Sequence, residues 1–461
     1  MLYYNAPFEL RETENNMAEK TSSLHQIVIV GGGAGGIELA TKLGNKLGKR
    51  KKAEITLIDC TLTHIWKPLL HEIAAGTLDS HADDLEYLAQ ANWHHFKFRY
   101  GRMDSLDRGK QEVSLAPTVD ENGVEYIPRR NFHYDTLIIA VGSTTNDFGI
   151  KGVKEHCYSL DTREQAERFH SLLLKKCYSA QTSTKPLREG QLHVAIAGAG
   201  ATGVELAAEL HESTRELVAY GLDNIDPDRD LKISLIEAAD RILPALPERL
   251  SNATVEALQK INVDVRTGER IIEATPDGFK TESGHFIPSE IKVWAAGIKA
   301  PDFLQDIDGL ETNRINQLVV KSTLQTTRDE NIFAFGDCAA CPVKPGSEEL
   351  VPPRAQAAHQ QASMLVKSMK RRLQGHALPE YKYVDYGSLV NLSSYTTVGN
   401  LMGNLLGRWT GSVMLEGVIA RFIYKSLYRM HRIALYGVVG TLLQDIANLL
   451  IRKPRRRLKF H

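Results

Sequence analysis

Two glycine-rich segments of this 461-residue chain have a spacing that suits the pyrophosphate of a dinucleotide. In the first segment, Gly31, Gly33 and Gly36 form the pattern G-x-G-x-x-G. The first glycine permits a tight turn, the second lets the backbone approach a pyrophosphate, and the third lets a helix pack close to a strand. The phosphate charge would then face the N-terminus of the following helix. This segment therefore predicts one dinucleotide site.

The elements around this first segment match the motif. Residues 25–30 read as a short strand, a helix pattern follows the glycines, and residues 54–59 read as a second strand that ends in Asp59. An acid at that place can accept a hydrogen bond from a ribose hydroxyl. The order strand, glycine turn, helix, strand, acid is the context that the motif requires.

The same unit occurs a second time further along the chain. A strand is predicted over residues 191–197, and another over residues 231–237 ends in Glu237. The glycines of this unit are Gly198, Gly200 and Gly203. Two alanines follow Glu237, and a carboxylate there repels a 2′-phosphate, so NADH is favoured over NADPH. Arg241 argues mildly against this preference, and a solvated acid at a strand end is the alternative for Glu237.

Three further apolar strands are predicted to end in glycine, near Gly142, Gly297 and Gly336. Glycine at a strand end suggests close approach of the backbone to a ligand or a crossover between domains. Two nucleotide sites in one chain imply electron transfer between the nucleotides. We find no Ser/His/Asp arrangement and no metal-ligand cluster with convincing spacing.

Together, the segments GGGAGGIELA, TLIIAVGS, GAGATGVELAAEL and FAFGD resemble the flavoproteins that carry two dinucleotide-binding domains. Within that family, residues 64–79, the Glu-bearing second glycine loop and residues 352–362 (PPRAQAAHQQA) are similar to type II NADH dehydrogenases. The resemblance runs from about residue 25 to the C-terminus. It implies non-covalent FAD at the first site, NADH at the second, and a membrane quinone, ubiquinone or menaquinone, as acceptor. It also implies that the enzyme feeds a respiratory chain without pumping protons.

The resemblance assigns roles residue by residue. FAD would be held by Gly31, Gly33, Gly36, Asp59, Pro68, Leu69, Gly142, Gly336 and Asp337, with Asp337 on the ribityl chain and Pro68 and Leu69 near the isoalloxazine. NADH would be held by Gly198, Gly200, Gly203, Glu237, Ala296 and Gly297. Glu205 would lie near the nicotinamide.

Gln356 and Gln360 match the family's quinone-site glutamines. They are four residues apart, so they share one face of a helix. Pro352 and Pro353 are expected at the start of that helix. The alternative interpretation is an ordinary polar helix face. The three histidines His64, His71 and His359 are expected to be structural or solvated, and the sequence identifies no proton donor for the quinone.

Five cysteines, too few for a secreted disulfide scaffold, suggest a reducing compartment. Cys157 and Cys338 stand roughly where sulfide:quinone reductases carry their cysteines, which makes sulfide oxidation the alternative activity. The intact second glycine loop argues against it, because those enzymes need no NADH. We expect inert thiols, although Cys338 and Cys341 have dithiol spacing.

The C-terminal region has the pattern of an amphipathic helix. Over residues 418–437 an apolar stripe runs beside a basic one, Gly437 is a plausible break, and residues 439–450 form a second apolar face. Such a helix fits the lipid interface. Packing against the body or a dimer partner is one alternative. A single span over 433–451 is another, but Asp445 makes it costly.

Charge is distributed unevenly, although Lys and Arg equal Asp and Glu at 56 each. Residues 401–461 carry eleven basic residues against Glu416 and Asp445. A balanced body with a basic, apolar tail suggests a protein that rests on an anionic lipid surface. Together with the resemblance, this implies a peripheral, monotopic protein on the cytoplasmic face of a bacterial inner membrane. No aromatic-interleaved motif supports nucleic-acid binding. A homodimer is expected.

The expected fold class is α/β, with two Rossmann-like, glutathione-reductase-like domains, the NADH domain inserted in the FAD domain, and C-terminal amphipathic membrane-docking helices. The predicted parts are a leader (1–23), the FAD domain (24–160 and 301–375), the NADH domain (161–300) and a membrane-associating region (376–461). A flavoenzyme with a soluble acceptor and a nucleotide-sensing binding protein remain as alternatives.

Overall fold

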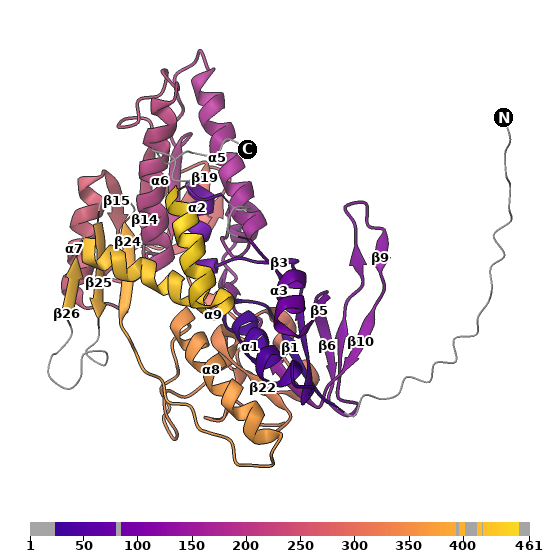
Figure 1. The fold of residues 1–461 in the computed structure, drawn as a ribbon. Coiled ribbons are helices and arrows are strands. Elements are labelled where there is room, and N and C mark those ends of the chain that lie inside the picture. The colour runs from indigo at the N-terminus through magenta and orange to yellow at the C-terminus, as the bar shows by residue number, and fades with distance from the viewer. Residues whose placement is uncertain (1–23, 80–83, 393–395, 402–412, 417, 451–461) are drawn as a thin grey trace, which may run out of the picture.

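The computed structural model describes residues 24–79, 84–392, 396–401, 413–416 and 418–450. The predicted leader and the basic tail after residue 450 lie outside these ranges. Two parallel sheets, each covered by helices, form the body of the molecule, and a smaller C-terminal unit lies beside them (Figure 1).

The first sheet has five parallel strands in the order β22-β11-β1-β2-β5. They span β1 (His25–Val30), β2 (Ala53–Asp59), β5 (Lys97–Tyr100), β11 (Thr136–Ile139) and β22 (Ile332–Ala334). The four residues of β11 are all buried, as expected for parallel strands that are covered on both faces. Helices α1 (Ala34–Leu43) and α8 (Ala355–Arg372) pack against each other beside this sheet (Figure 1).

The second sheet has four parallel strands in the order β15-β14-β13-β19. They span β13 (His193–Ala197), β14 (Lys232–Ile236), β15 (Val263–Arg266) and β19 (Ile291–Trp294). Its helices are α5 (Arg163–Gln181), α6 (Ala201–Ala219) and α7 (Glu248–Lys260). This whole sheet lies in the chain between β11 and β22, which are neighbours in the first sheet. The predicted insertion of one Rossmann-like domain in the other is therefore confirmed.

The chain crosses between the two sheets through a short pair of strands. β12 (Thr144–Thr145), on the way out, pairs antiparallel with β20 (Ile298–Lys299), on the way back. Both strands follow the carboxyl end of a sheet strand, β11 and β19 respectively. Because carboxyl ends of parallel strands share one edge of a sheet, this crossover brings the ligand-binding edges of both sheets to the same region.

Antiparallel sheets and short elements complete the body. The three-stranded sheets combine β6 (Met103–Asp107), β7 (Glu112–Leu115) and β10 (Arg130–His133), then β16 (Ile271–Thr275), β17 (Gly278–Thr281) and β18 (Phe286–Pro288), and finally β24 (Ser388–Leu392), β25 (Thr396–Leu401) and β26 (Val413–Glu416). The short elements are β3 (Thr63–His64), α2 (Leu70–Ala75), β4 (Leu85–Glu86), α3 (Tyr87–His94), β8 (Thr118–Val119), β9 (Glu125–Ile127), α4 (Val153–His156), β21 (Leu318–Val319) and β23 (Ala339–Ala340).

The last helix, α9 (Val418–Leu450), has two arms that meet at Gly437 (Figure 1). Gly437 has φ 74° and ψ 170°, a conformation that glycine alone adopts readily, so the predicted break is confirmed. Arg432 on the first arm binds Asp445 on the second at 3.2 Å and Gln444 at 2.6 Å. These contacts hold the two arms at an angle.

The outer face of the second arm is apolar. Its exposed residues are Val438, Val439, Leu442, Leu443 and Ile446. The polar residues of this arm turn the other way, since Thr441 is buried and Asp445 pairs with the first arm. Among the described residues, no helix combines the length and the hydropathy that a bilayer span requires.

Packing at the second glycine loop yields a stability prediction. A Cβ on Gly203 would lie 2.0 Å from the carbonyl oxygen of Gly198, whereas a Cβ on Gly200 would meet nothing within 4 Å. Gly203→Ala should therefore force the backbone apart and lower the free energy of unfolding by about 1–3 kcal/mol. Thermal unfolding of both variants tests this. If Gly203→Ala has the same melting temperature as Gly200→Ala and the unchanged chain, the close packing at Gly203 is contradicted.

Candidate functional site

One large cavity, of about 1840 Å³, lies between the carboxyl ends of the two sheets. Its wall is built from both glycine loops, the turn before α2, the start of α8 and the first arm of α9. The predicted site residues on this wall are Gly31, Gly33, Gly36, Asp59, Pro68, Leu69, Gly142, Gly200, Glu205, Gly297, Gly336, Asp337, Gln356 and Gln360. Gly198, Gly203, Glu237 and Ala296 do not line this cavity; they belong to the second glycine loop and to the ends of β14 and β19.

The first glycine loop is shaped to leave one open side. A Cβ on Gly31 would lie 2.4 Å from the carbonyl oxygen of Ala140, and one on Gly36 would lie 1.8 Å from the carbonyl oxygen of Gly31. A Cβ on Gly33 would meet no atom within 4 Å. The loop is thus closed on the protein side and free on the cavity side, at the start of α1. Backbone N–H groups and the helix dipole there favour a phosphate.

The acids at the two strand ends hold their glycine loops in the same way. Asp59 accepts hydrogen bonds from the backbone N–H of Gly32 at 2.6 Å and from the N–H and hydroxyl of Thr61 at 2.8 and 2.7 Å. Glu237 accepts from the backbone N–H groups of Ala199 at 2.8 Å and Ala239 at 3.0 Å. An ionised carboxylate has about four acceptor sites, so each acid keeps acceptor capacity for a ribose hydroxyl. The repeat seen in the sequence is therefore a repeat of geometry.

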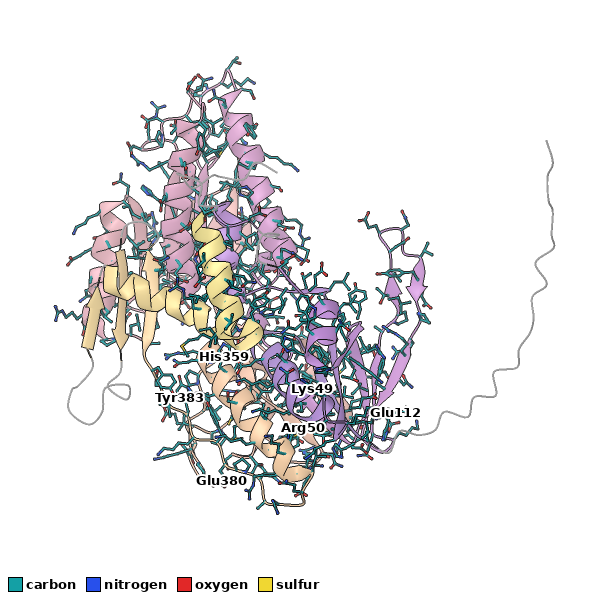
Figure 2. All side chains as sticks on the ribbon, in the orientation of Figure 1. Lys49, Arg50, Glu112, His359, Glu380 and Tyr383 are labelled. Atoms are coloured by element: carbon teal, nitrogen blue, oxygen red, sulfur yellow. The ribbon has the colours of Figure 1, made fainter. Side chains whose placement is uncertain are left out.

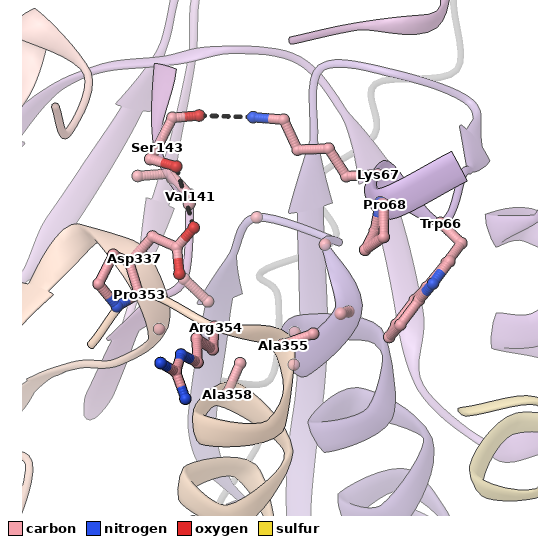
Figure 3. Close-up of a pocket in the computed structure, with 18 of the residues that line it drawn as sticks. Trp66, Lys67, Pro68, Val141, Ser143, Asp337, Pro353, Arg354, Ala355 and Ala358 are labelled. Carbon is pink, nitrogen blue, oxygen red and sulfur yellow. Dashed lines mark hydrogen bonds between the residues drawn. The ribbon is translucent and has the colours of Figure 1, made fainter. Parts of the chain in front are cut away.

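A chain of polar side chains crosses the cavity at the carboxyl ends of β11 and β22 (Figure 3). Lys67 donates to the carbonyl oxygen of Ser143 at 2.8 Å, and the Ser143 hydroxyl donates to Asp337 at 2.9 Å. Burial raises the pKa of Asp337, while the bond from Ser143 and the charge of Lys67 oppose that rise. Lys67 begins the turn that carries Pro68 and Leu69, so these two hydrogen bonds fix that turn opposite Asp337. Sequence reasoning missed Lys67 and Ser143.

Glu205 on α6 is buried beside the backbone of Asn391 and the side chain of His71. Its carboxylate accepts from the backbone N–H of Asn391 at 3.0 Å, and Nδ1 of His71 lies 3.8 Å away. Burial lowers the pKa of His71 to about 4, so His71 is neutral near pH 7. His71, expected to be structural or solvated, is buried next to a predicted site residue.

Gln356 and Gln360 both lie on α8 and on the cavity wall, as their spacing predicts. The helix begins at Ala355 with Arg354 as its N-cap. Pro352 and Pro353 therefore precede the N-cap, and their expected place at the start of the helix is wrong. Both glutamine side chains bond to residues 384–387.

An aromatic and histidine cluster that the sequence did not reveal lies at the α9 end of the cavity. The Trp66 ring lies 4.2 Å from the His431 ring and 5.7 Å from the His359 ring, between ring centroids. His359 binds Glu38 through Nδ1. Burial raises the pKa of Glu38, but bonds from His359 and Lys42 outweigh it and leave that pKa below its usual value. The pairing of His359 with Glu38 spans 321 residues, so no local pattern could have predicted it.

His64 joins this cluster to the first glycine loop. Its Nδ1 donates to the carbonyl oxygen of Gly32 at 3.0 Å, and its Nε2 lies 2.9 Å from Nε2 of His431. Burial lowers the pKa of His64 to about 4, so the ring is neutral and its Nε2 accepts from His431. The first arm of α9 is thereby bonded to the first glycine loop through His64.

The cysteines do not form a reactive pair. Among the described residues all five thiols are free. Burial raises the pKa values of Cys157 and Cys338 to about 12, which disfavours the thiolate. The alternative activity, sulfide oxidation through these two residues, is therefore less supported.

Comparison with known proteins identifies a family that matches most of the chain and relatives that align with it. A model of the pyridine nucleotide-disulphide oxidoreductase family matches residues 25–362. A type II NADH:quinone oxidoreductase of Haemophilus influenzae is 45% identical over 95% of this chain and 100% of its own length. One from Staphylococcus aureus is 29% identical over 87% of this chain and 95% of its own.

Solved structures share the fold. NDH2 from Plasmodium falciparum, in complex with RYL-552, has a TM-score of 0.76 at 19% identity and covers 95% of this chain and 100% of its own. The sulfide:quinone oxidoreductase of Aquifex aeolicus has a TM-score of 0.67 at 18% identity and covers 95% and 98%.

The family match covers most of the chain, and the Haemophilus relative aligns over nearly all of it. The two glycine loops, each closed by a strand-end acid, supply the structural counterpart of that match. The chain therefore belongs to the pyridine nucleotide-disulphide oxidoreductase family and, within it, to the type II NADH:quinone oxidoreductases.

Proposed function

We propose that this protein oxidises NADH, passes two electrons through non-covalently bound FAD, and reduces a membrane quinone without pumping protons. The observation that carries the proposal is the large cavity, whose wall includes residues of both glycine loops, α8 and α9. NADH bound at the second loop and a quinone bound beside α8 would both reach the isoalloxazine ring of FAD in this cavity. The predicted division into FAD, NADH and membrane-associating parts is proposed on the same basis.

The residues of the first loop fit FAD. The open side of Gly33, the start of α1 and the acceptor capacity of Asp59 suit an adenosine diphosphate. Asp337 would accept from the ribityl chain, and Pro68 and Leu69 would lie against the ring system. Bound FAD would supply the two-electron carrier between donor and acceptor. The protein's part is to orient the nucleotides and to exclude water from between them.

The second loop suits NADH. Gly200 leaves its cavity side open, as Gly33 does in the first loop. Glu237 would accept from the adenosine ribose and repel a 2′-phosphate. Glu205 and Gly297, on the wall between the two loops, would lie beside the nicotinamide. Gly198, Gly203 and Ala296 would shape the loop from behind.

The C-terminal unit is proposed to bind the membrane peripherally. The exposed apolar face of the second arm of α9 has the character of an interfacial helix. Basic residues of the same region would favour the anionic, cytoplasmic face of a bacterial inner membrane. A long-chain quinone would then enter from the lipid along the cavity wall formed by Tyr428, Met430 and Ala434. A homodimer is a further part of the proposal.

The strand-end acid of the second loop provides a test of donor specificity. Glu237→Arg should raise the KM for NADH about tenfold or more, because it removes the proposed acceptor for the ribose hydroxyl and the two bonds that the carboxylate makes to the N–H groups of Ala199 and Ala239. It should also narrow the preference for NADH over NADPH. Steady-state kinetics with both donors measure this. Glu237→Gln, which keeps the size of the side chain, is the matched control and should lose less; an unchanged NADH KM in Glu237→Arg would contradict the assignment.

The exposed face of α9 provides a test of membrane binding. Replacing Leu442 and Leu443 together by Glu should weaken binding to vesicles with anionic lipid at least about tenfold, because both side chains lose apolar burial and add repulsion. Flotation assays measure this. The control is Leu88→Glu, an equally exposed leucine on α3, which should bind as before. Equal binding of the double variant would place the membrane contact elsewhere.

A further inference from the structure

The side chains of Gln356 and Gln360 are bonded to a backbone segment that crosses the cavity wall. This segment, residues 384–387, is called the strap below. Gln360 donates from Nε2 to the carbonyl oxygen of Val384 at 2.7 Å and accepts from the Val384 N–H at 3.1 Å. The amide of Gln360 thus pairs with the strap on both sides, as a neighbouring strand would.

Gln356 makes a similar set of bonds one helical turn earlier. Its Oε1 accepts from the N–H of Tyr386 at 3.1 Å, and its Nε2 donates to the carbonyl oxygen of Gly387 at 3.1 Å and to Asp385 at 3.2 Å. A primary amide has two N–H donors, and both donors of Gln356 are in use. No N–H of Gln356 is left for a quinone oxygen.

Ionic contacts hold the middle of the strap. Asp385 pairs with Arg354, the N-cap of α8, at 3.1 Å and accepts from the N–H of Gly387 at 2.8 Å. The strap is therefore held to the start of α8 by three side chains, Arg354 at the N-cap and Gln356 and Gln360 on one face of the first two turns. Figure 2 shows Glu380 and Tyr383 on the loop that leads into the strap beside α8.

The strap also forms part of the cavity wall. It leads directly into the segment that contacts Glu205, the third residue predicted to take part in catalysis. Tyr386 and Gly387 line the cavity. The chain then enters β24, where the backbone N–H of Asn391 donates to Glu205 at 3.0 Å. A displacement of the strap would consequently move the wall beside α8 and the segment that contacts Glu205 together.

We infer that Gln356 and Gln360 are positioning residues, which fasten the strap across the cavity wall, and that their effect on quinone reduction passes through the strap. This inference rests on the proposed quinone reduction. It assigns the contact surface for the quinone on this side to the strap, Tyr386 and the Gly387 backbone, in place of the Gln356 amide that the sequence resemblance suggests.

The first test reads the strap in the full-length protein without any quinone. Hydrogen–deuterium exchange should show the amides of Val384 and Tyr386 protected, because each donates to a glutamine oxygen. Gln360→Leu should accelerate exchange at Val384, and Gln356→Leu at Tyr386, by about tenfold or more. The matched control is Gln374→Leu, an exposed residue just after the same helix, which should change neither amide. Equal exchange in all four proteins would overturn the inference.

The second test is a double-mutant cycle on the quinone KM. Arg354→Ala loosens the strap by removing the ionic partner of Asp385, and it removes no atom that bonds to either glutamine side chain. If Gln356 acts through the strap, Gln356→Leu should raise the quinone KM severalfold in the unchanged chain and add little in the Arg354→Ala background. Full additivity of the two effects would mean that Gln356 contacts the quinone directly, and would overturn the inference.

The two tests separate this inference from the proposed function. Exchange at Val384 and Tyr386 needs no substrate, so it reports on the strap even if the acceptor has been wrongly assigned. Suppose that the unchanged protein reduces no quinone but its strap amides are protected. That result would contradict the proposed function and any role of the strap in quinone reduction. The anchoring of the strap by the two glutamines would still stand. Unprotected strap amides with normal quinone reduction would contradict the inference alone.

Discussion

The backbone at both glycine loops lies too close to a neighbouring strand end to admit a side chain. At Gly31 the obstacle is the carbonyl of Ala140 after β11, and at Gly198 it is the backbone of Ala296 after β19. This close approach brings the starts of α1 and α6 to the carboxyl edges of their sheets. Each helix then directs unpaired N–H groups toward the same cavity. Asp59 and Glu237 lock the two loops from the strand side.

Given these two fixed loops, the remaining wall is assembled from segments that are far apart in the chain. Lys67, Ser143 and Asp337 are joined by hydrogen bonds that span 76 and 194 residues, and these bonds fix the turn that carries Pro68. The α9 side is held through the pairing of His64 with His431, across 367 residues. Such contacts exclude water and set the distance between bound groups, which is the contribution expected from the protein when a cofactor carries out the redox chemistry.

The sequence predicted those features whose signals are local. The bounds of β1 agree exactly, both glycine loops are where their spacing places them, and the break at Gly437 in α9 is correct. These predictions rest on periodicity and on the conformations that only glycine adopts readily. The two glutamines also share α8, as a spacing of four requires.

The missing parts depend on tertiary contacts. Nothing near Gln356 in the sequence indicates that its amide binds residues 386 and 387, and nothing near His64 indicates His431. The start of α8 was misplaced, because Arg354 and not a proline caps it; Arg354 is held by Asp385 from the strap. The outward direction of the apolar face of α9 likewise depends on the pairing of Arg432 with Asp445, which the helical pattern alone does not specify.

The most direct measurement of the central claim is an anaerobic stopped-flow experiment on the purified protein, with flavin absorbance recorded after mixing first with NADH and then with a quinone. The account predicts rapid bleaching by NADH and recovery of the absorbance on addition of quinone. Bleaching by NADH without recovery would contradict the assigned acceptor. Bleaching by sulfide but not by NADH would contradict the assigned donor and, with it, the role of the second glycine loop.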